Sequence, residues 1–109
     1  MSQVELLAII TPNPGKTDRV VELLKGMSEY VKANEPGTLR YHIHREVNKK
    51  SGVEEVIMLE TYTDKKALAA HGSSARFKAF GKQLKDEGLV QGPMNLKFLK
   101  VEGGFAARL

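Results

Sequence analysis

Short apolar segments alternate with two long amphipathic segments along the chain. The first apolar segment, Val4 to Thr11, ends at the turn sequence "PNPG" and predicts a strand with apolar residues on both faces. From Lys16 to Asn34, apolar side chains recur at helical spacing. Pro36 and Gly37 predict the end of this helix, because neither residue continues it readily.

Two further strands and a divided helix are predicted to follow. Thr38 to Val47 alternates between apolar and polar positions, with Leu39, Tyr41 and Ile43 on one face, which predicts a strand with one solvated face. The turn sequence "NKKSG" leads to a mostly apolar strand, Glu54 to Thr63, so the two strands should form a hairpin.

The second helical region has its own start and interruption signals. Thr63 or Asp64 can cap its beginning. Its apolar positions change face at Gly72, so we expect the helix to stop there, with Ser73 or Ser74 capping the second part, "ARFKAFGKQL". Met94 to Glu102 predicts a last strand.

The order of these elements is β-α-β-β-α-β, which predicts an α+β, ferredoxin-like domain with a four-stranded antiparallel sheet. In the strand order 4-1-3-2, the two strands that are apolar on both faces are central, as burial requires. We expect residues 1–109 to form a single domain.

Two helices can cover only one face of such a sheet. Alternate residues of Leu6 to Ile10 and of Val56 to Leu59 would then leave an apolar patch on the other face. We therefore expect a homodimer in which two sheets pack face to face about a twofold axis.

Composition and charge narrow the classes of function. The 109 residues include no Cys, which excludes disulfides, thiolate nucleophiles and cysteine zinc sites. The net charge is +4, but acids are interspersed among the lysines and no aromatic platform accompanies them, so we expect no nucleic-acid partner. The longest apolar run, "LLAII", is too short to cross a bilayer.

We accordingly expect a cytoplasmic protein without a membrane partner. If the source is a eukaryote, the ending Ala107, Arg108 and Leu109 would resemble a peroxisomal signal.

The segments "EPGTLRYHIHRE" and "EEVIMLETYTDKKALAAHGSSARFKAF" together resemble the antibiotic biosynthesis monooxygenase (ABM) domain family. The matching positions are the turn Glu35, Pro36 and Gly37, the strand aromatic Tyr41, Glu60 and Tyr62 on the next strand, and His71, Phe77 and Phe80 in the helical region.

The resemblance implies a dimeric α+β barrel with a pocket in each subunit between the sheet and the helices. It also implies oxidation of quinols, anthrones and related phenols by O2 with no cofactor, neither metal nor flavin. Related barrels isomerise small metabolites or degrade haem. Tyr62 stands near the position where several oxygenases and the haem-degrading proteins have Trp, and the chain has no Trp, which argues against haem degradation.

His71 and Glu60 are the candidate catalytic residues. His71 shares a helical face with Ala67 and Leu68, so it should face the sheet, where an imidazole can take a proton from a phenol or a carbon acid. Glu60 is the only charge within "VIMLETY", and a buried carboxylate needs a partner; we expect it to bond His71 or to hold a proton itself. A purely structural hydrogen bond is the alternative for each.

Candidate substrate-binding residues surround this pair. Tyr41, Tyr62 and Asn13 could hydrogen-bond a phenolate or carbonyl, and Phe77 and Phe80 could contact an aromatic ring. Asn13 could instead be a turn residue, and the aromatic side chains could be core residues.

His42, His44 and Glu46 share a strand face and resemble a ligand set for iron. Along a straight strand they would span roughly 13 Å, which is too far for one ion, so we expect no metal.

The sequence therefore predicts a monooxygenase that oxidises a small aromatic substrate, a quinol or a polyketide-like phenol, with O2. Two alternatives remain open. One is a non-catalytic dimeric ligand-binding or stress-related module, and the other is an isomerase or lyase of small oxo acids in which His71 transfers a proton without oxygen.

Overall fold

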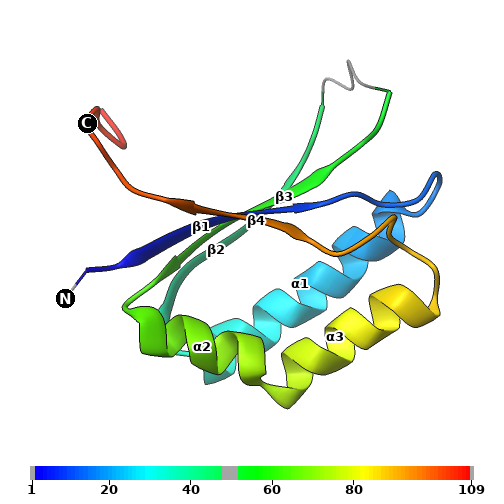
Figure 1. Cartoon of the computed structure of the whole chain (residues 1–109), viewed down its shortest axis with the longest axis horizontal. Helices are drawn as coiled ribbons and strands as arrows, with labels where there is room; N and C mark the ends of the chain where they lie inside the picture. The colour runs from blue at the N-terminus through cyan, green and yellow to red at the C-terminus, as the bar shows by residue number, and fades with distance from the viewer. Residues whose placement is uncertain (1, 48–51, 109) are drawn as a thin grey trace.

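A four-stranded antiparallel sheet carries helices on one face (Figure 1). The computed structural model describes residues 2–47 and 52–108. The strands are β1 (Val4–Ile10), β2 (Thr38–Arg45), β3 (Val56–Tyr62) and β4 (Asn95–Leu99), and the helices are α1 (Thr17–Asn34), α2 (Lys65–Ser73) and α3 (Ala75–Asp86). The strand order β2-β3-β1-β4 confirms the predicted ferredoxin-like topology, with the two most apolar strands at the centre.

The core lies between the central strands and the helices α1 and α3. Its buried residues come from alternate positions of the strands and from helical spacing on the helices: Ala8, Ile10, Val20, Leu24, Met27, Val31, Val56, Met58, Phe80, Leu84 and Leu89. Each fully buried aliphatic or aromatic side chain of this kind stabilises the fold by about 1.5–3 kcal/mol. Helical spacing thus decides which face of α1 and α3 is buried, and the packing of these helices decides which face of β1 and β3 they cover.

The sheet register fixes which side chains share a face. Leu6 lies opposite Glu60 on β3 and Phe98 on β4, so all three project toward the helices. Leu7 lies opposite Leu59, and both project to the other face, which no helix covers in Figure 1. These pairs define an inner face, toward the helices, and an open face on the other side of the sheet.

The β2–β3 hairpin is confirmed by antiparallel pairs from Thr38 opposite Tyr62 to Arg45 opposite Val56. One position departs from the predicted alternation. A register irregularity between Thr38 and Arg40 displaces Leu39, which is 53% exposed and does not join Tyr41 on the inner face. The predicted turn between the strands falls largely on residues 48–51, outside the described residues.

The second helical region is divided, but not at Gly72. Asp64 caps α2 by accepting a hydrogen bond from Ala67 N at 2.8 Å. Gly72 lies inside α2, and the break occurs at Ser74, whose extended ψ of 147° ends the helix. Ser74 Oγ then accepts from Phe77 N at 3.0 Å and caps α3. A local cap, and not the glycine, therefore sets the joint.

The chain beyond β4 leaves the body of the domain. The strand is shorter than the predicted Met94–Glu102 segment and ends at Leu99. The following residues run away from the sheet toward the C-terminus (Figure 1). No helix within the described residues is long and apolar enough to cross a membrane.

Candidate functional site

His71 lies on the inner face of α2, as its helical spacing predicts. Only 4% of the residue is exposed. Aromatic rings of three side chains surround the imidazole, with centroid distances of 5.5 Å to Tyr41, 5.6 Å to Tyr62 and 4.8 Å to Phe77. The histidine is therefore held in a mostly apolar setting, where its hydrogen-bond partner matters.

That partner is Glu35, not the predicted Glu60. His71 Nδ1 lies 2.8 Å from Glu35 Oε1. An ionised carboxylate can only accept hydrogen bonds, so this geometry favours the neutral tautomer with its proton on Nδ1 and its lone pair on Nε2. Glu35 thereby selects the tautomer of His71 in which Nε2 can act as a base.

A close backbone approach brings these two residues together. Glu35 caps the end of α1, and Gly37 follows in the turn before β2. A Cβ atom on Gly37 would lie 2.7 Å from Ala67 Cβ, closer than the two atoms can approach. Thr63 N also donates to Gly37 O at 2.8 Å. Glycine at this turn therefore lets α2 approach the segment that carries Glu35.

Glu60 has a different partner. Tyr62 lies two residues further along β3 on the same face, and its hydroxyl donates to Glu60 Oε1 at 2.5 Å. Both side chains are buried. Burial raises the pKa of Glu60, and the hydrogen bond from Tyr62 and the nearby His71 oppose this only in part. Glu60 therefore holds its proton to a higher pH than an exposed carboxyl group does.

The two tyrosines remain phenols over the physiological pH range. Burial is the main cause that raises the pKa of Tyr41 and of Tyr62 far above the usual tyrosine range, and the neighbouring carboxylate of Glu60 raises both further. Each hydroxyl is accordingly a hydrogen-bond donor.

His71 and Glu60 both face a small inner cavity of about 110 Å³. We call it the inner cavity; its lining residues are Leu6, Ala8, Leu24, Tyr41, Met58, Glu60, Leu68, His71, Gly72, Phe77, Phe80, Met94 and Leu96. Most of these are apolar, so a base and a carboxyl group meet in a largely water-poor space. Such an environment suits proton transfer between these groups and a bound molecule.

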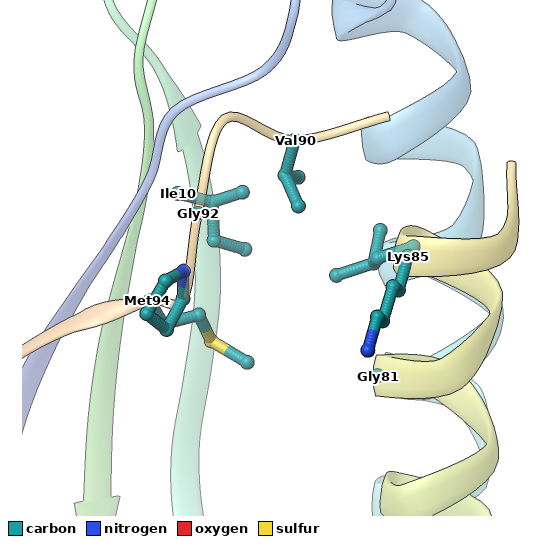
Figure 2. A pocket seen from close by; sticks show the side chains of 8 residues that line it. Ile10, Gly81, Lys85, Val90, Gly92 and Met94 are labelled. Atoms are coloured by element: carbon teal, nitrogen blue, oxygen red, sulfur yellow. The ribbon is translucent and has the colours of Figure 1, made fainter. Parts of the chain in front are cut away.

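A larger hollow, which we call the outer cavity, lies further along α3 (Figure 2). Its volume is about 530 Å³, and it is lined by Ile10, Gly81, Leu84, Lys85, Val90, Gly92, Pro93 and Met94. Figure 2 shows Ile10 and Met94 on one side and Lys85 on α3 on the other. Met94 lines both cavities, so its side chain forms a shared wall.

The structure brings together most of the sequence-predicted residues, with one exception. Tyr41, Phe77 and Phe80 line the inner cavity. Tyr62 is not among the lining residues, but its hydroxyl donates a hydrogen bond to Glu60, which is. Asn13 lies elsewhere: its amide donates to the carbonyl oxygens of Gly88 at 2.8 Å and Val90 at 3.3 Å. Asn13 therefore ties down the loop between α3 and β4, in accord with the turn-residue interpretation.

Sequence reasoning missed three features of the site. Glu35 stood in the recognised "EPG" turn, but nothing in its spacing pointed to His71. Lys85 and Met94 carried no local signal, because each lines the outer cavity only through the packing of α3 near the end of β1 and the segment before β4.

The histidines of β2 lie on the opposite, exposed face of the sheet. Arg40 Nε donates to His42 Nδ1 at 3.0 Å, and the rings of His42 and His44 are 6.0 Å apart. Over residues 2–47 and 52–108, no group of His, Cys, Asp and Glu side chains is arranged to hold a metal ion.

The fold and the site define a ferredoxin-like α+β protein with buried acid–base groups in an apolar cavity. Residues 4–83 match the model of the family described as antibiotic biosynthesis monooxygenase. The chain therefore belongs to the ABM family, as the sequence resemblance implies.

Several solved structures are similar to this chain. A proposed antibiotic biosynthesis monooxygenase from Caulobacter crescentus is 30% identical, with a TM-score of 0.77 and coverage of 92% of this chain and 91% of that one. Rv0793 from Mycobacterium tuberculosis is 21% identical, with a TM-score of 0.78 and coverage of 96% and 100%. PA3566 from Pseudomonas aeruginosa is 23% identical, with a TM-score of 0.78 and coverage of 94% and 97%.

The last two likenesses show the fold alone. Comparison with curated proteins gives no match.

Proposed function

We propose that the protein is a cofactor-independent monooxygenase that oxidises a quinol or a polyketide-like aromatic phenol with O2. One observation carries the proposal: His71, which is paired with Glu35, and the proton-holding Glu60 line the same apolar cavity. Family membership supports an oxygenase, but the reaction is inferred from these groups.

The first step would be removal of a proton from the substrate. His71 Nε2 takes it from a phenolic hydroxyl or from an acidic C–H beside a carbonyl, and Glu35 stabilises the imidazolium that forms. The apolar walls then leave the substrate anion poorly solvated, which favours electron transfer from the anion to O2.

The oxygen step can be written in balance. The anion gives one electron to O2, and the two radicals combine into a substrate peroxide. Cleavage of the O–O bond leaves one oxygen atom on the substrate as a carbonyl and releases the other as water, with the two hydrogens that the substrate lost. Glu60 is suited to supply a proton to the departing oxygen, because burial keeps that proton in place.

Oxygen uptake and isotope incorporation test this proposal. The purified protein is mixed with 1,4-dihydroxynaphthalene or anthrone, and oxygen-18 gas labels the product. We expect uptake above the uncatalysed rate and one labelled atom per product molecule. His71→Ala should lose the catalysed rate, whereas His42→Ala on the exposed sheet face should retain it. Equal rates in the two variants would overturn the role of His71, and no catalysed uptake across both substrates would overturn the reaction.

The same acid–base pair also favours a second function, that of a proton-shuttling isomerase. A base and a carboxyl group in one cavity could move a proton between two carbons of an oxo acid without oxygen. Deuterium exchange from solvent into the substrate under anaerobic conditions distinguishes it from the oxygenase, which needs O2 for turnover.

We also propose that two copies pack through the open sheet face. Leu7, Ile9, Ile57 and Leu59 lie on this face and are only partly buried in the single chain. A contiguous apolar patch of this kind in a two-layer domain favours a second copy of the same surface.

A further inference from the structure

The inner and outer cavities lie end to end along the same seam of the fold. On β1, Ala8 lines the inner cavity and Ile10, two residues on, lines the outer one. On α3, Phe80 lines the inner cavity and Leu84, one turn on, lines the outer one. Met94 lines both cavities. One molecule that enters from the outer side would therefore reach His71 and Glu60 at the inner end.

The inner cavity is too small to hold an aromatic substrate by itself. Its volume is about 110 Å³, whereas sites for drug-sized ligands occupy about 300–1,000 Å³. The outer cavity, at about 530 Å³, lies within that range. Met94 is unbranched with several rotatable bonds, so its side chain can move aside at low cost and join the two spaces. The body of a ligand would then lie in the outer cavity, with one end at His71.

The outer cavity has one distinctive polar feature. Among the described residues that line it, Lys85 alone is charged. Figure 2 shows its side chain running along α3 toward Gly81, on the side that faces the hollow. Within the described part of the chain no carboxylate pairs with Lys85, whereas Lys82, three residues earlier, pairs with Asp86. The ammonium group is therefore free to bind an anion.

We propose that the site takes an elongated aromatic acid, with its flat body in the outer cavity, its carboxylate on Lys85 and its reacting hydroxyl beside His71. The assignment of the hydroxyl end rests on the proposed function. The assignment of the carboxylate end rests only on the outer cavity and Lys85.

The spacing along α3 sets the length of such a ligand. Phe77 contacts His71, and Lys85 lies eight residues further on. At about 1.5 Å of rise per residue, these positions are roughly 12 Å apart along the helix axis. The Lys85 side chain leans back toward Gly81 and shortens this span (Figure 2). A ligand that reaches both positions therefore needs an elongated body, such as a fused aromatic ring system with hydroxyl and carboxylate at opposite ends.

Ligand fluorescence offers a direct binding test, because the protein has no Trp to interfere. The probes are 6-hydroxy-2-naphthoic acid, 2-naphthoic acid without the hydroxyl, and 2-naphthol without the carboxylate. We expect Lys85→Gln to lower the affinity for both acids by roughly three- to tenfold, because one partly exposed charge pair is lost. The affinity for 2-naphthol should be unchanged. Lys78→Gln, an exposed lysine on the same helix, is the matched control.

A second pair of variants tests the outer cavity without removing a charge. A Cβ atom on Gly81 meets nothing within 4 Å, so Gly81→Leu fills the hollow without disturbing the core. We expect Gly81→Leu to lower the affinity for all three ligands. The control is Ala79→Leu, which places the same side chain on an exposed position of α3. Leucine is a good helix-forming residue at both positions, so folding is preserved.

The outcomes separate this inference from the proposed function. Equal effects of Lys85→Gln and Lys78→Gln, or unchanged binding in Gly81→Leu, would overturn the inference even if the protein consumes oxygen. Lys85-dependent binding of the acids supports the inference even if the protein consumes no oxygen. The absence of oxygen consumption would overturn only the monooxygenase proposal.

Discussion

His71 Nδ1 lies 2.8 Å from Glu35 Oε1, although the two residues are 36 positions apart in the chain. The carboxylate comes from the end of α1 and the imidazole from the inner face of α2. Glu35 Oε2 is buried and has no hydrogen-bond partner among the described residues, so Oε1 and His71 account for much of the stabilisation of this carboxylate. Because Glu35 does not line the inner cavity, its role in the proposed mechanism is to position His71 and not to contact the substrate.

Glu35→Gln tests this positioning role. The amide can present either an oxygen or an NH2 group to Nδ1, so the tautomer of His71 is no longer selected. We expect kcat to fall by about 10- to 100-fold with a smaller change in KM, because tautomer selection affects the base and not the cavity walls. Nitrogen-15 NMR of the imidazole should show mixed tautomers. Glu29→Gln on the exposed side of α1 is the control, and an unchanged imidazole spectrum in Glu35→Gln would contradict the role.

Glu60 should make the folded protein less stable as the pH rises. Its pKa is raised by burial from the usual value of 4.5, so the folded state binds this proton more tightly than the unfolded state does. This stabilisation is complete below about pH 4.5 and is lost as the pH rises toward the pKa of Glu60 in the folded state. The loss amounts to about 1.4 kcal/mol for each unit by which the folded-state pKa exceeds the unfolded-state pKa.

Glu60→Gln removes this titration while keeping a similar shape. Urea unfolding between pH 4 and pH 8 should show a flatter stability profile for the variant than for the wild type, with Glu29→Gln as the unchanged control. A Glu60→Gln profile as steep as that of the wild type would remove Glu60 as the source of the pH dependence.

Tyr62→Phe removes the donor to Glu60 Oε1. The buried carboxyl group loses its partner, so we expect a loss of about 1–3 kcal/mol in the free energy of unfolding and a further rise in the pKa of Glu60. The pH profile of activity should shift upward accordingly. Tyr30→Phe is a suitable control because Tyr30 contacts Arg76 through its ring. A purely structural Tyr62 would change stability without moving the pH profile.

Ser74→Ala tests the joint between α2 and α3. Ser74 Oγ accepts from Phe77 N and donates to His71 O at 3.0 Å, so its loss affects both the cap and the end of α2. We expect about 1 kcal/mol of destabilisation in thermal or urea unfolding. Ser73→Ala should have a smaller effect, because Ser73 Oγ is exposed and lies 3.4 Å from Ala70 O. Equal destabilisation by the two variants would contradict the assigned cap.

Leu59→Lys tests the proposed packing of two copies. A lysine at the centre of the open sheet face would have to be desolvated in a face-to-face dimer. Light scattering at micromolar concentration should give twice the mass of one chain for the wild type and the mass of one chain for Leu59→Lys. Val47→Lys, at a residue that is 95% exposed, should behave as the wild type. A wild-type protein with the mass of one chain would refute the dimer.

Local sequence signals predicted the elements well, because they depend on neighbours in the chain. The spacing of Val20, Leu24, Met27 and Val31 placed one face of α1 in the core. Apolar residues on both faces of β1 and β3 predicted that these two strands lie at the centre of the sheet. The interruption of the second helical region was also predicted, although the cap at Ser74 and not Gly72 sets its position.

The sequence by itself determined the order of the elements, the buried face of the helices, and the presence of His71 on the inner face of its helix. These follow from periodicities that each segment carries within itself. Only the tertiary structure decided that His71 pairs with Glu35, that Glu60 pairs with Tyr62, that Asn13 binds a loop, and that Lys85 and Met94 line a cavity. Such relationships depend on distances between packed segments, and the close approach at Gly37 that brings α2 to Glu35 exists only in the folded chain.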